Sequence, residues 1–166
     1  MELVPATRRH LLDDLTVRGY VQDRVHAWTL HDPICPHGQR AIVVRAAGGW
    51  SQPEHRSGGE FPLLYIDSWA DCSRTDTGER AGQDAISNAM AVHRAVDRLI
   101  QGVRGQRWGA IGAQPGLSIV SVERWAEPVP QTASDSHAGE AAALPYRVPL
   151  QDAAVVTTAY AVITFH

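Results

Sequence analysis

The pattern of apolar and polar positions in the first half of the chain predicts three β-strands, of which the first alternates between the two classes. The predicted strands are residues 24–30, 40–46 and 61–69. The third is apolar on both faces until it reaches Asp67 and Ser68. Because a strand that is apolar on both faces is normally buried on both, we expect 61–69 to be central in its sheet.

Apolar residues at spacings of three and four predict two helices. The first covers residues 6–15, with Pro5 just ahead of it and Thr7 as a candidate N-cap. The second is longer and amphipathic, from about residue 82 to 103. Between the first helix and the first strand, residues 16–23 predict a second helical turn or a loop.

The second half of the chain contains two more predicted strands, at residues 117–126 and 152–166. The segment 127–149 between them has four prolines and many small residues. It is long for a connection in a compact domain, which predicts a functional arm or an extended hairpin tip. Residues 47–60 and 71–80 are rich in glycine or polar residues and are expected to be loops.

The resulting element order is α, β, β, β, α, β, β, and a chain of 166 residues fits one domain. Short links between neighbouring strands favour antiparallel pairing. We therefore predict an α+β fold over residues 1–166: a mostly antiparallel sheet of about five strands, one long helix on a face and a short N-terminal helix.

Charge and cysteine content narrow the classes of function. The chain has 15 basic residues, all arginine, and 18 acidic residues, giving a formal net charge of −3. A nucleic-acid-binding domain is usually basic with clustered charge, so this class is disfavoured. The N-terminus does not resemble a secretory signal, and we expect a soluble protein made in a reducing cytoplasm, with Cys35 and Cys72 as free thiols.

Candidate metal and catalytic residues form only weak patterns. His31, Cys35, His37 and Cys72 could complete a tetrahedral zinc set, but their spacing matches no common zinc motif, and a turn containing them by chance is the simpler interpretation.

A group of acids, Asp67, Asp71, Asp76 and Glu79, could serve acid–base chemistry, or could simply be solvated at a strand end and in a loop. There is no nucleophile elbow, P-loop or dinucleotide fingerprint, and His93 lies on the apolar stripe of the long helix. We therefore expect no enzyme, no cofactor and no resident metal.

Surface contacts are the remaining candidate function. The five tryptophans are Trp28, Trp50, Trp69, Trp108 and Trp125. Tryptophan and arginine are enriched at interface hot spots, although these tryptophans could equally pack back over loops. The candidate interface residues are Trp50, Arg56, Arg74, Arg80, Trp108, Tyr146 and Arg147.

The order of elements and several local patterns together resemble one family. The stretches that carry the resemblance are RRHLLDDLTVRGYVQDRV (8–25), FPLLYIDSWAD (61–71), DAISNAMAVHRAVDRLIQ (84–101), LSIVSVERWAEPVP (117–130) and LPYRVPLQDAAVVTTAYAVITFH (144–166). The chain resembles the tail terminator proteins of siphophages, particularly those of actinobacterial phages. The resemblance covers nearly the whole chain, and none of these motifs is diagnostic alone.

The resemblance implies a structural virion protein that forms a ring, typically a hexamer, on the head-proximal end of the tail tube. Such a ring ends tube growth and presents a surface to the head connector, while DNA passes through its lumen without specific binding. Its partners would be copies of itself, the tail tube protein and the connector, in the virion and, during assembly, in the host cytoplasm, with no membrane. Another neck protein, such as a head-closure or tail-completion factor, and a small zinc-binding protein are the alternatives.

Overall fold

The structure of the protein is a computed structural model. It describes residues 2–28, 39–50, 61–71, 79–112, 116–132 and 153–165, and within these it does not place the side chains of 48–50, 61, 79–82, 132 and 165.

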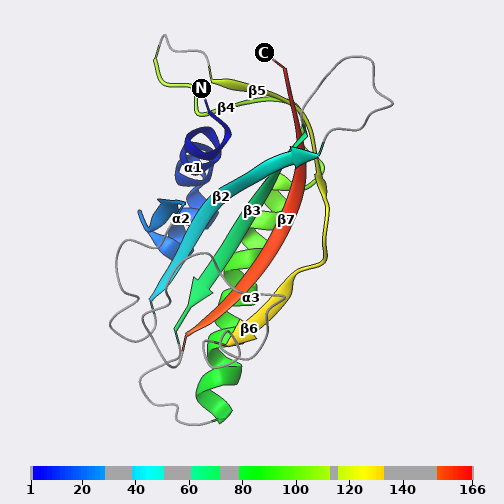
Figure 1. Cartoon of the computed structure of the whole chain (residues 1–166). Helices are drawn as coiled ribbons and strands as arrows, with labels where there is room; N and C mark the ends of the chain where they lie inside the picture. The colour runs from blue at the N-terminus through cyan, green and yellow to red at the C-terminus, as the bar shows by residue number, and fades with distance from the viewer. Residues whose placement is uncertain are drawn as a thin grey trace.

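A single seven-stranded sheet forms the body of the protein (Figure 1). The strands are β1 (Val25–Ala27), β2 (Arg40–Trp50), β3 (Phe61–Ala70), β4 (Arg104–Trp108), β5 (Leu117–Arg124), β6 (Val129–Thr132) and β7 (Ala154–Phe165). Their spatial order is β1-β2-β3-β7-β5-β4, and β6 also pairs with β7. β3 lies between β2 and β7, so the expected central strand is central.

The α+β class is confirmed, but the sheet differs in two ways from the expected one. It has seven strands rather than about five, and it is mixed because β1 runs parallel to β2 while the other described pairs are antiparallel.

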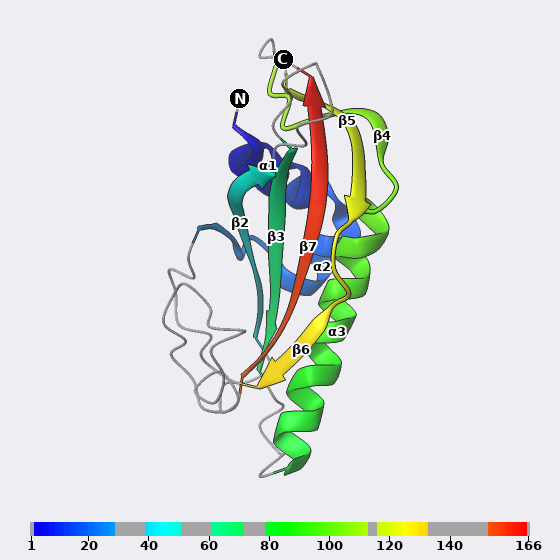
Figure 2. The same cartoon turned by 45° about the vertical axis from the view of Figure 1, so that its right-hand side comes forward.

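Three helices cover one face of the sheet (Figures 1 and 2). They are α1 (Leu3–Asp13), α2 (Leu15–Val21) and α3 (Glu79–Ile100). α3 lies along β3, β6 and β7, whereas α1 packs on β1, β2 and β4, and α2 bridges α1 and α3. The long helix on a face is therefore present, and two short helices accompany it.

The N-terminal helix starts earlier than its sequence suggests. α1 begins at Leu3 with Glu2 as its N-cap, so Thr7 is inside the helix and not its cap. Pro5 is accommodated because the first-turn N–H groups of a helix have no partner within it. The buried Thr7 hydroxyl donates to the Leu3 carbonyl at 2.8 Å, and the turn predicted at 16–23 is a true helix capped by Asp14.

The core lies between the helices and the sheet. Alternate residues of the strands, such as Ile42, Leu64 and Ile66, face Val92 and Val96 of α3, and all five are buried. Burying such side chains contributes roughly 1.5–3 kcal/mol each, before the entropy cost of ordering them. The 3.6-residue stripe of α3 and the period-two pattern of the strands therefore meet in one apolar layer.

Several sequence-based boundaries need correction. β4, with the sequence RGQRW, was not expected, because four of its five residues are exposed and polar or glycine. β2 continues to Trp50 into a segment expected to be a loop, and α3 starts at Glu79, so Arg80 is helical. The expected arm at 127–149 includes β6, which pairs with residues 154–157 of β7, and the rest of the arm from 133 lies outside the described residues.

Candidate assembly surface

The two sides of the sheet end in different strands. On one side, β1 pairs with only Ile42–Val44 of β2, and within the described chain no strand pairs with residues 45–50 on that side. On the other side, β4 and β6 are the outer strands. An outer strand presents unpaired backbone N–H and C=O groups to which another chain can add. The sheet therefore offers two edges of different sequence.

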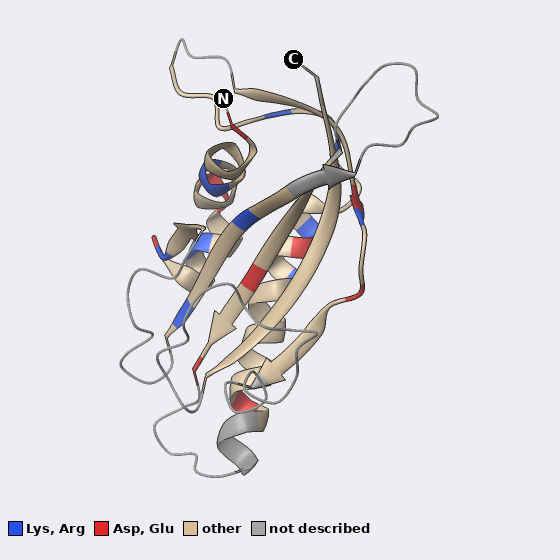
Figure 3. Cartoon of the chain, in the orientation of Figure 1, with Lys and Arg blue, Asp and Glu red and all other residues tan. Residues whose placement is uncertain are grey.

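The β5–β6 side carries exposed apolar side chains. Trp125 is 54% exposed, Val129 50% and Val120 45%. Trp125 is positioned by its own backbone, whose N–H donates to the Ala159 carbonyl of β7 at 2.8 Å. Neither β6 nor β7 carries a charged residue in its described length (Figure 3). Aromatic enrichment and charge depletion are both typical of the centre of a protein–protein interface.

A polar network anchors the base of this surface to α3. Arg124, at the end of β5, donates to Asp97 at 2.5 Å and to Gln101 at 2.8 Å. The Tyr160 hydroxyl of β7 donates to the other Asp97 oxygen at 2.9 Å. The hydrogen bond to Asp97 raises the pKa of Arg124, and burial, followed by the Asp97 charge, raises the pKa of Tyr160. One carboxylate thus joins α3, β5 and β7, which fixes the strand that leads into Trp125.

Asp67 belongs to a second polar group, on the sheet face opposite the helices. Its side chain is fully buried, and Arg45 of β2 donates to it from Nε at 2.6 Å and from a terminal nitrogen at 3.0 Å. The Thr157 hydroxyl of β7 donates to it at 2.8 Å, and the Arg45 guanidinium lies 4.9 Å from the centre of the Tyr65 ring. The sequence suggested a solvated acid at a strand end, whereas the structure shows an ion pair across three strands.

This group of residues indicates a structural role rather than acid–base catalysis. The Asp67 carboxylate accepts two hydrogen bonds from the Arg45 guanidinium, and it is not exposed to solvent. Asp71 is also buried, Asp76 lies outside the described residues, and the Glu79 side chain is not described. Among the residues that are described, no three His, Cys, Asp or Glu side chains gather as a metal site would require.

The zinc interpretation stays a prediction. His31, Cys35, His37 and Cys72 all lie outside the described residues. Metal analysis of the protein purified without a histidine tag checks it directly: near-stoichiometric zinc would support the interpretation, and its absence would contradict it.

His93 packs in the core, as its position on the apolar stripe predicts. It is 2% exposed, and its Nδ1 lies 3.3 Å from the Thr158 hydroxyl of β7. Burial is the largest cause that lowers its pKa, and Asp97 opposes that effect. A neutral imidazole is therefore favoured between helix and sheet.

Trp108 requires a correction as an interface candidate. It is fully buried, and its ring stacks on His10 with 4.7 Å between centroids and an interplanar angle of 11°. Trp108 is the last residue of β4, and its side chain turns inward against α1. The alternative weighed from the sequence, that a tryptophan packs back over its loop, applies to this residue.

The other candidates are placed only in part. Trp50 ends β2 and Arg80 is in the first turn of α3, but their side chains are not described, and the remaining candidates, Arg56, Arg74, Tyr146 and Arg147, lie outside the described residues. All six stay predictions as interface residues.

Among the tryptophans whose side chains the structure describes, Trp28 and Trp125 are exposed, and neither was among the interface candidates. Trp28 is 52% exposed and has a left-handed φ of 70°, which is uncommon for a bulky residue. Its backbone N–H donates to the Val44 carbonyl at 2.8 Å. The sequence held a signal for Trp28, because the alternation in 24–30 puts it on the same face as Arg24 and His26.

No helix within the described residues is both long and apolar enough to cross a membrane.

Comparison with known proteins finds likenesses among solved structures, but not among family models or curated sequences. Among solved structures, the chain is similar to one from the "Virion of native gene transfer agent (GTA) particle", with a TM-score of 0.52 and 12% identity. The alignment covers 98% of this chain and 95% of that chain. At this identity the likeness shows that the two chains share a fold along nearly their entire lengths.

Proposed function

We propose that this protein is a structural component of a phage-like virion that functions by assembly with other virion proteins. The observation that carries the proposal is the fold shared, over 98% of this chain and 95% of the other, with a protein of a gene transfer agent virion. Near-complete coverage in both directions means that the whole domain corresponds, and not a small common motif.

Within that class, we propose a ring, hexameric in the resembled family, that caps the head-proximal end of a tail tube. A ring of identical subunits requires a heterologous interface, in which two different surfaces meet head to tail. The sheet supports this, because residues 45–50 of β2 lie on one side and β4 and β6 on the other. The exposed Trp125 and Val129 supply apolar area next to one of these edges.

The net charge of −3 fits a protein that DNA passes without being held, since like charges repel. The tail tube protein and the head connector would contact the two faces of the ring. The candidates Trp50, Arg56, Arg74, Arg80, Tyr146 and Arg147 stay proposed contacts in this arrangement.

Deletion of the gene, followed by electron microscopy of lysates, tests the function. Tubes of uncontrolled length beside separate filled heads would support tail termination. Tails of normal length that fail to join heads would instead assign the protein to head closure or tail completion. Intact infectious particles would refute a structural role.

A pair of point variants tests the surface. Trp125→Asp places a charge on the exposed apolar side and is expected to block ring formation, as seen by size-exclusion chromatography with light scattering. Leu15→Asp is the control, because Leu15 is 80% exposed but belongs to α2 and not to a strand of the sheet. Equal assembly of both variants would remove Trp125 from the interface.

A further inference from the structure

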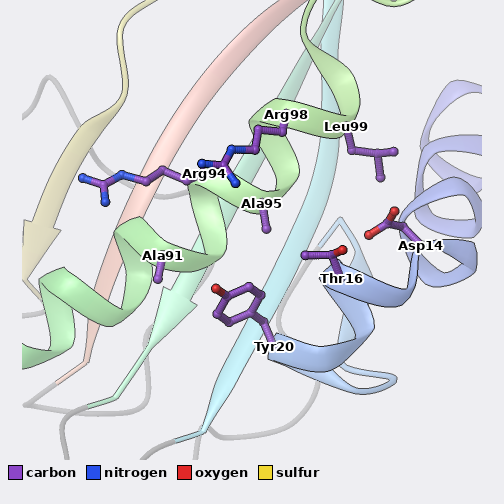
Figure 4. A pocket seen from close by; sticks show the side chains of 8 residues that line it. All are labelled: Asp14, Thr16, Tyr20, Ala91, Arg94, Ala95, Arg98 and Leu99. Atoms are coloured by element: carbon purple, nitrogen blue, oxygen red, sulfur yellow. The ribbon is translucent and has the colours of Figure 1, made fainter.

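A groove lies between α2 and α3 (Figure 4). It encloses about 420 Å³. Its lining residues are Asp14, Thr16, Tyr20, Ala91, Arg94, Ala95, Arg98 and Leu99.

Small apolar side chains form part of the α3 wall of the groove. Ala91 and Ala95, four residues apart on α3, leave space that a larger side chain would fill. Figure 4 shows the Tyr20 ring projecting from α2 toward these alanines. The space can therefore accept a small aliphatic side chain from outside.

A contact with Arg40 of β2 holds the Tyr20 ring in position. The Arg40 guanidinium of β2 lies 5.3 Å from the centre of the Tyr20 ring, and it also donates to Asn88 of α3 at 2.9 Å. Arg40 thus ties both walls of the groove to the sheet, and a ligand would meet a preformed surface at a lower entropy cost.

Two arginines on α3 give the groove its charge. Arg94 and Arg98 are both exposed, and neither has an ion pair or hydrogen bond to another residue in the part of the chain that the structure describes. Like charges at i and i+4 of a helix are mildly destabilising. The acid in the lining, Asp14, uses one oxygen to accept the Val17 N–H at 2.8 Å as the cap of α2. The groove therefore has unmatched positive charge beside an apolar space, on a chain of net negative charge.

We propose that the α2–α3 groove binds an acidic polypeptide segment of a partner, which inserts one aliphatic side chain between Tyr20 and the two alanines and places carboxylates on Arg94 and Arg98. Guanidinium groups pair with carboxylates in bidentate geometry, which gives this site its specificity. A peptide fits better than nucleic acid, because two arginines beside an apolar space do not make the extended basic track that a phosphate backbone needs. The inference deepens the proposed function by naming the chemistry of one partner, and it rests on that function only for the partner's identity.

Selection from a random peptide library against the isolated, full-length protein tests the proposal. We expect enriched sequences with Asp or Glu on either side of one aliphatic residue. Arg94→Glu/Arg98→Glu should weaken binding of a selected peptide by roughly tenfold or more. Ala91→Leu, which fills the groove without changing its charge, should also weaken it.

The matched control is Arg104→Glu/Arg107→Glu, the same change of charge at exposed positions of β4. This variant should bind the selected peptide as the unchanged protein does, and thermal unfolding should show that all variants are folded. Neutral or basic selected peptides, no enrichment, or equal loss in the β4 variant would overturn the proposal. Displacement of the peptide by a random-sequence oligonucleotide of similar affinity would overturn it in favour of a nucleic-acid site. These outcomes do not depend on whether the protein forms a ring or controls tail length.

Discussion

The ion pair between Arg45 and Asp67 should dominate the stability of the sheet centre. The Asp67 side chain is fully buried and the Arg45 side chain is 17% exposed, and the pair links β2 to β3. Replacing Arg45 by leucine keeps an apolar side chain beside Tyr65 and removes the guanidinium, while the Thr157 hydroxyl still donates to the carboxylate. The change therefore tests the cost of removing the Arg45 guanidinium from a buried carboxylate.

Removing one partner of a buried ion pair typically costs about 3–5 kcal/mol, because the remaining charge stays desolvated. Since Arg45 has partial access to solvent and Thr157 still donates to Asp67, we expect a loss near the lower limit, about 3 kcal/mol. For a chain of this size, 1 kcal/mol shifts the melting temperature by roughly 2–4 °C, so the expected fall is roughly 6–12 °C.

Urea unfolding followed by circular dichroism measures the free energy directly. The matched control is Arg9→Leu, which removes an exposed ion pair to Asp13 at 3.1 Å, with both side chains about half exposed. Such surface pairs contribute about 0–1 kcal/mol, so this variant should lose little stability. Adding Asp67→Asn to Arg45→Leu removes the buried charge and should recover about 1–2 kcal/mol.

The reasoning fails if Arg45→Leu costs no more than Arg9→Leu, because then the buried carboxylate is compensated by other groups. It also fails if the double variant is as unstable as the sum of the two single variants. In that case the two side chains contribute independently and not as a pair.

The remaining predictions concern hydrogen bonding, pH and backbone space. Tyr160→Phe loses the bond to Asp97 and should cost about 1.5–3 kcal/mol at pH 8 in urea unfolding. Burial raises the pKa of Tyr160 above its ordinary value of 10. Above pH 10, Tyr160 therefore loses its proton in the unfolded chain before it does so in the folded protein, which lowers the stability of the unsubstituted protein. The difference in stability from Tyr160→Phe should then narrow, and a constant difference would contradict this assignment. Burial lowers the pKa of His93 below 6.5, so the folded state keeps the imidazole neutral while the unfolded chain takes up a proton as the pH falls. The free energy of unfolding of the unsubstituted protein, relative to that of His93→Leu, should therefore decrease between pH 7.5 and 5. An increase would refute the direction of the pKa shift. A Cβ at Gly116 would lie 2.3 Å from the Trp108 carbonyl oxygen, so Gly116→Ala should lower the melting temperature, with a loss of about 1–3 kcal/mol. Gly19→Ala is its control: a Cβ there meets nothing within 4 Å inside α2, so it should be neutral or stabilise by up to about 1 kcal/mol, and the same loss in both variants would exclude the close contact as the cause.

The sequence identified the elements whose apolar periodicity is strong. α3, β5 and β7 were predicted within a few residues. In α3 the apolar stripe gave the signal, because burial of one helix face imposes a period on the sequence. The central place of β3 followed from its two apolar faces. The core position of His93 followed in the same way.

Strands that bury few side chains were missed or predicted too short. β4 carries mostly exposed polar residues, and its pairing with β5 through backbone hydrogen bonds leaves almost no trace in side-chain type. β6 contains Pro130 and was interpreted as part of an arm, since proline is compatible with an outer strand but does not indicate one. The parallel pairing of β1 likewise depends on the path of the chain, which periodicity does not encode.

The candidate surface was predicted least well, because exposure depends on what folds against each residue. Composition could single out the tryptophans, yet only the tertiary structure buries Trp108 against His10 and exposes Trp125. The sequence by itself determined the α+β class and the residues of the core, through local periodicity. Contacts between residues far apart in the chain, such as Arg45 with Asp67 and Tyr20 with Arg40, decided which polar groups are paired and which surface is open. Such contacts form only when the sheet and its helices pack together, so the tertiary structure alone decides them.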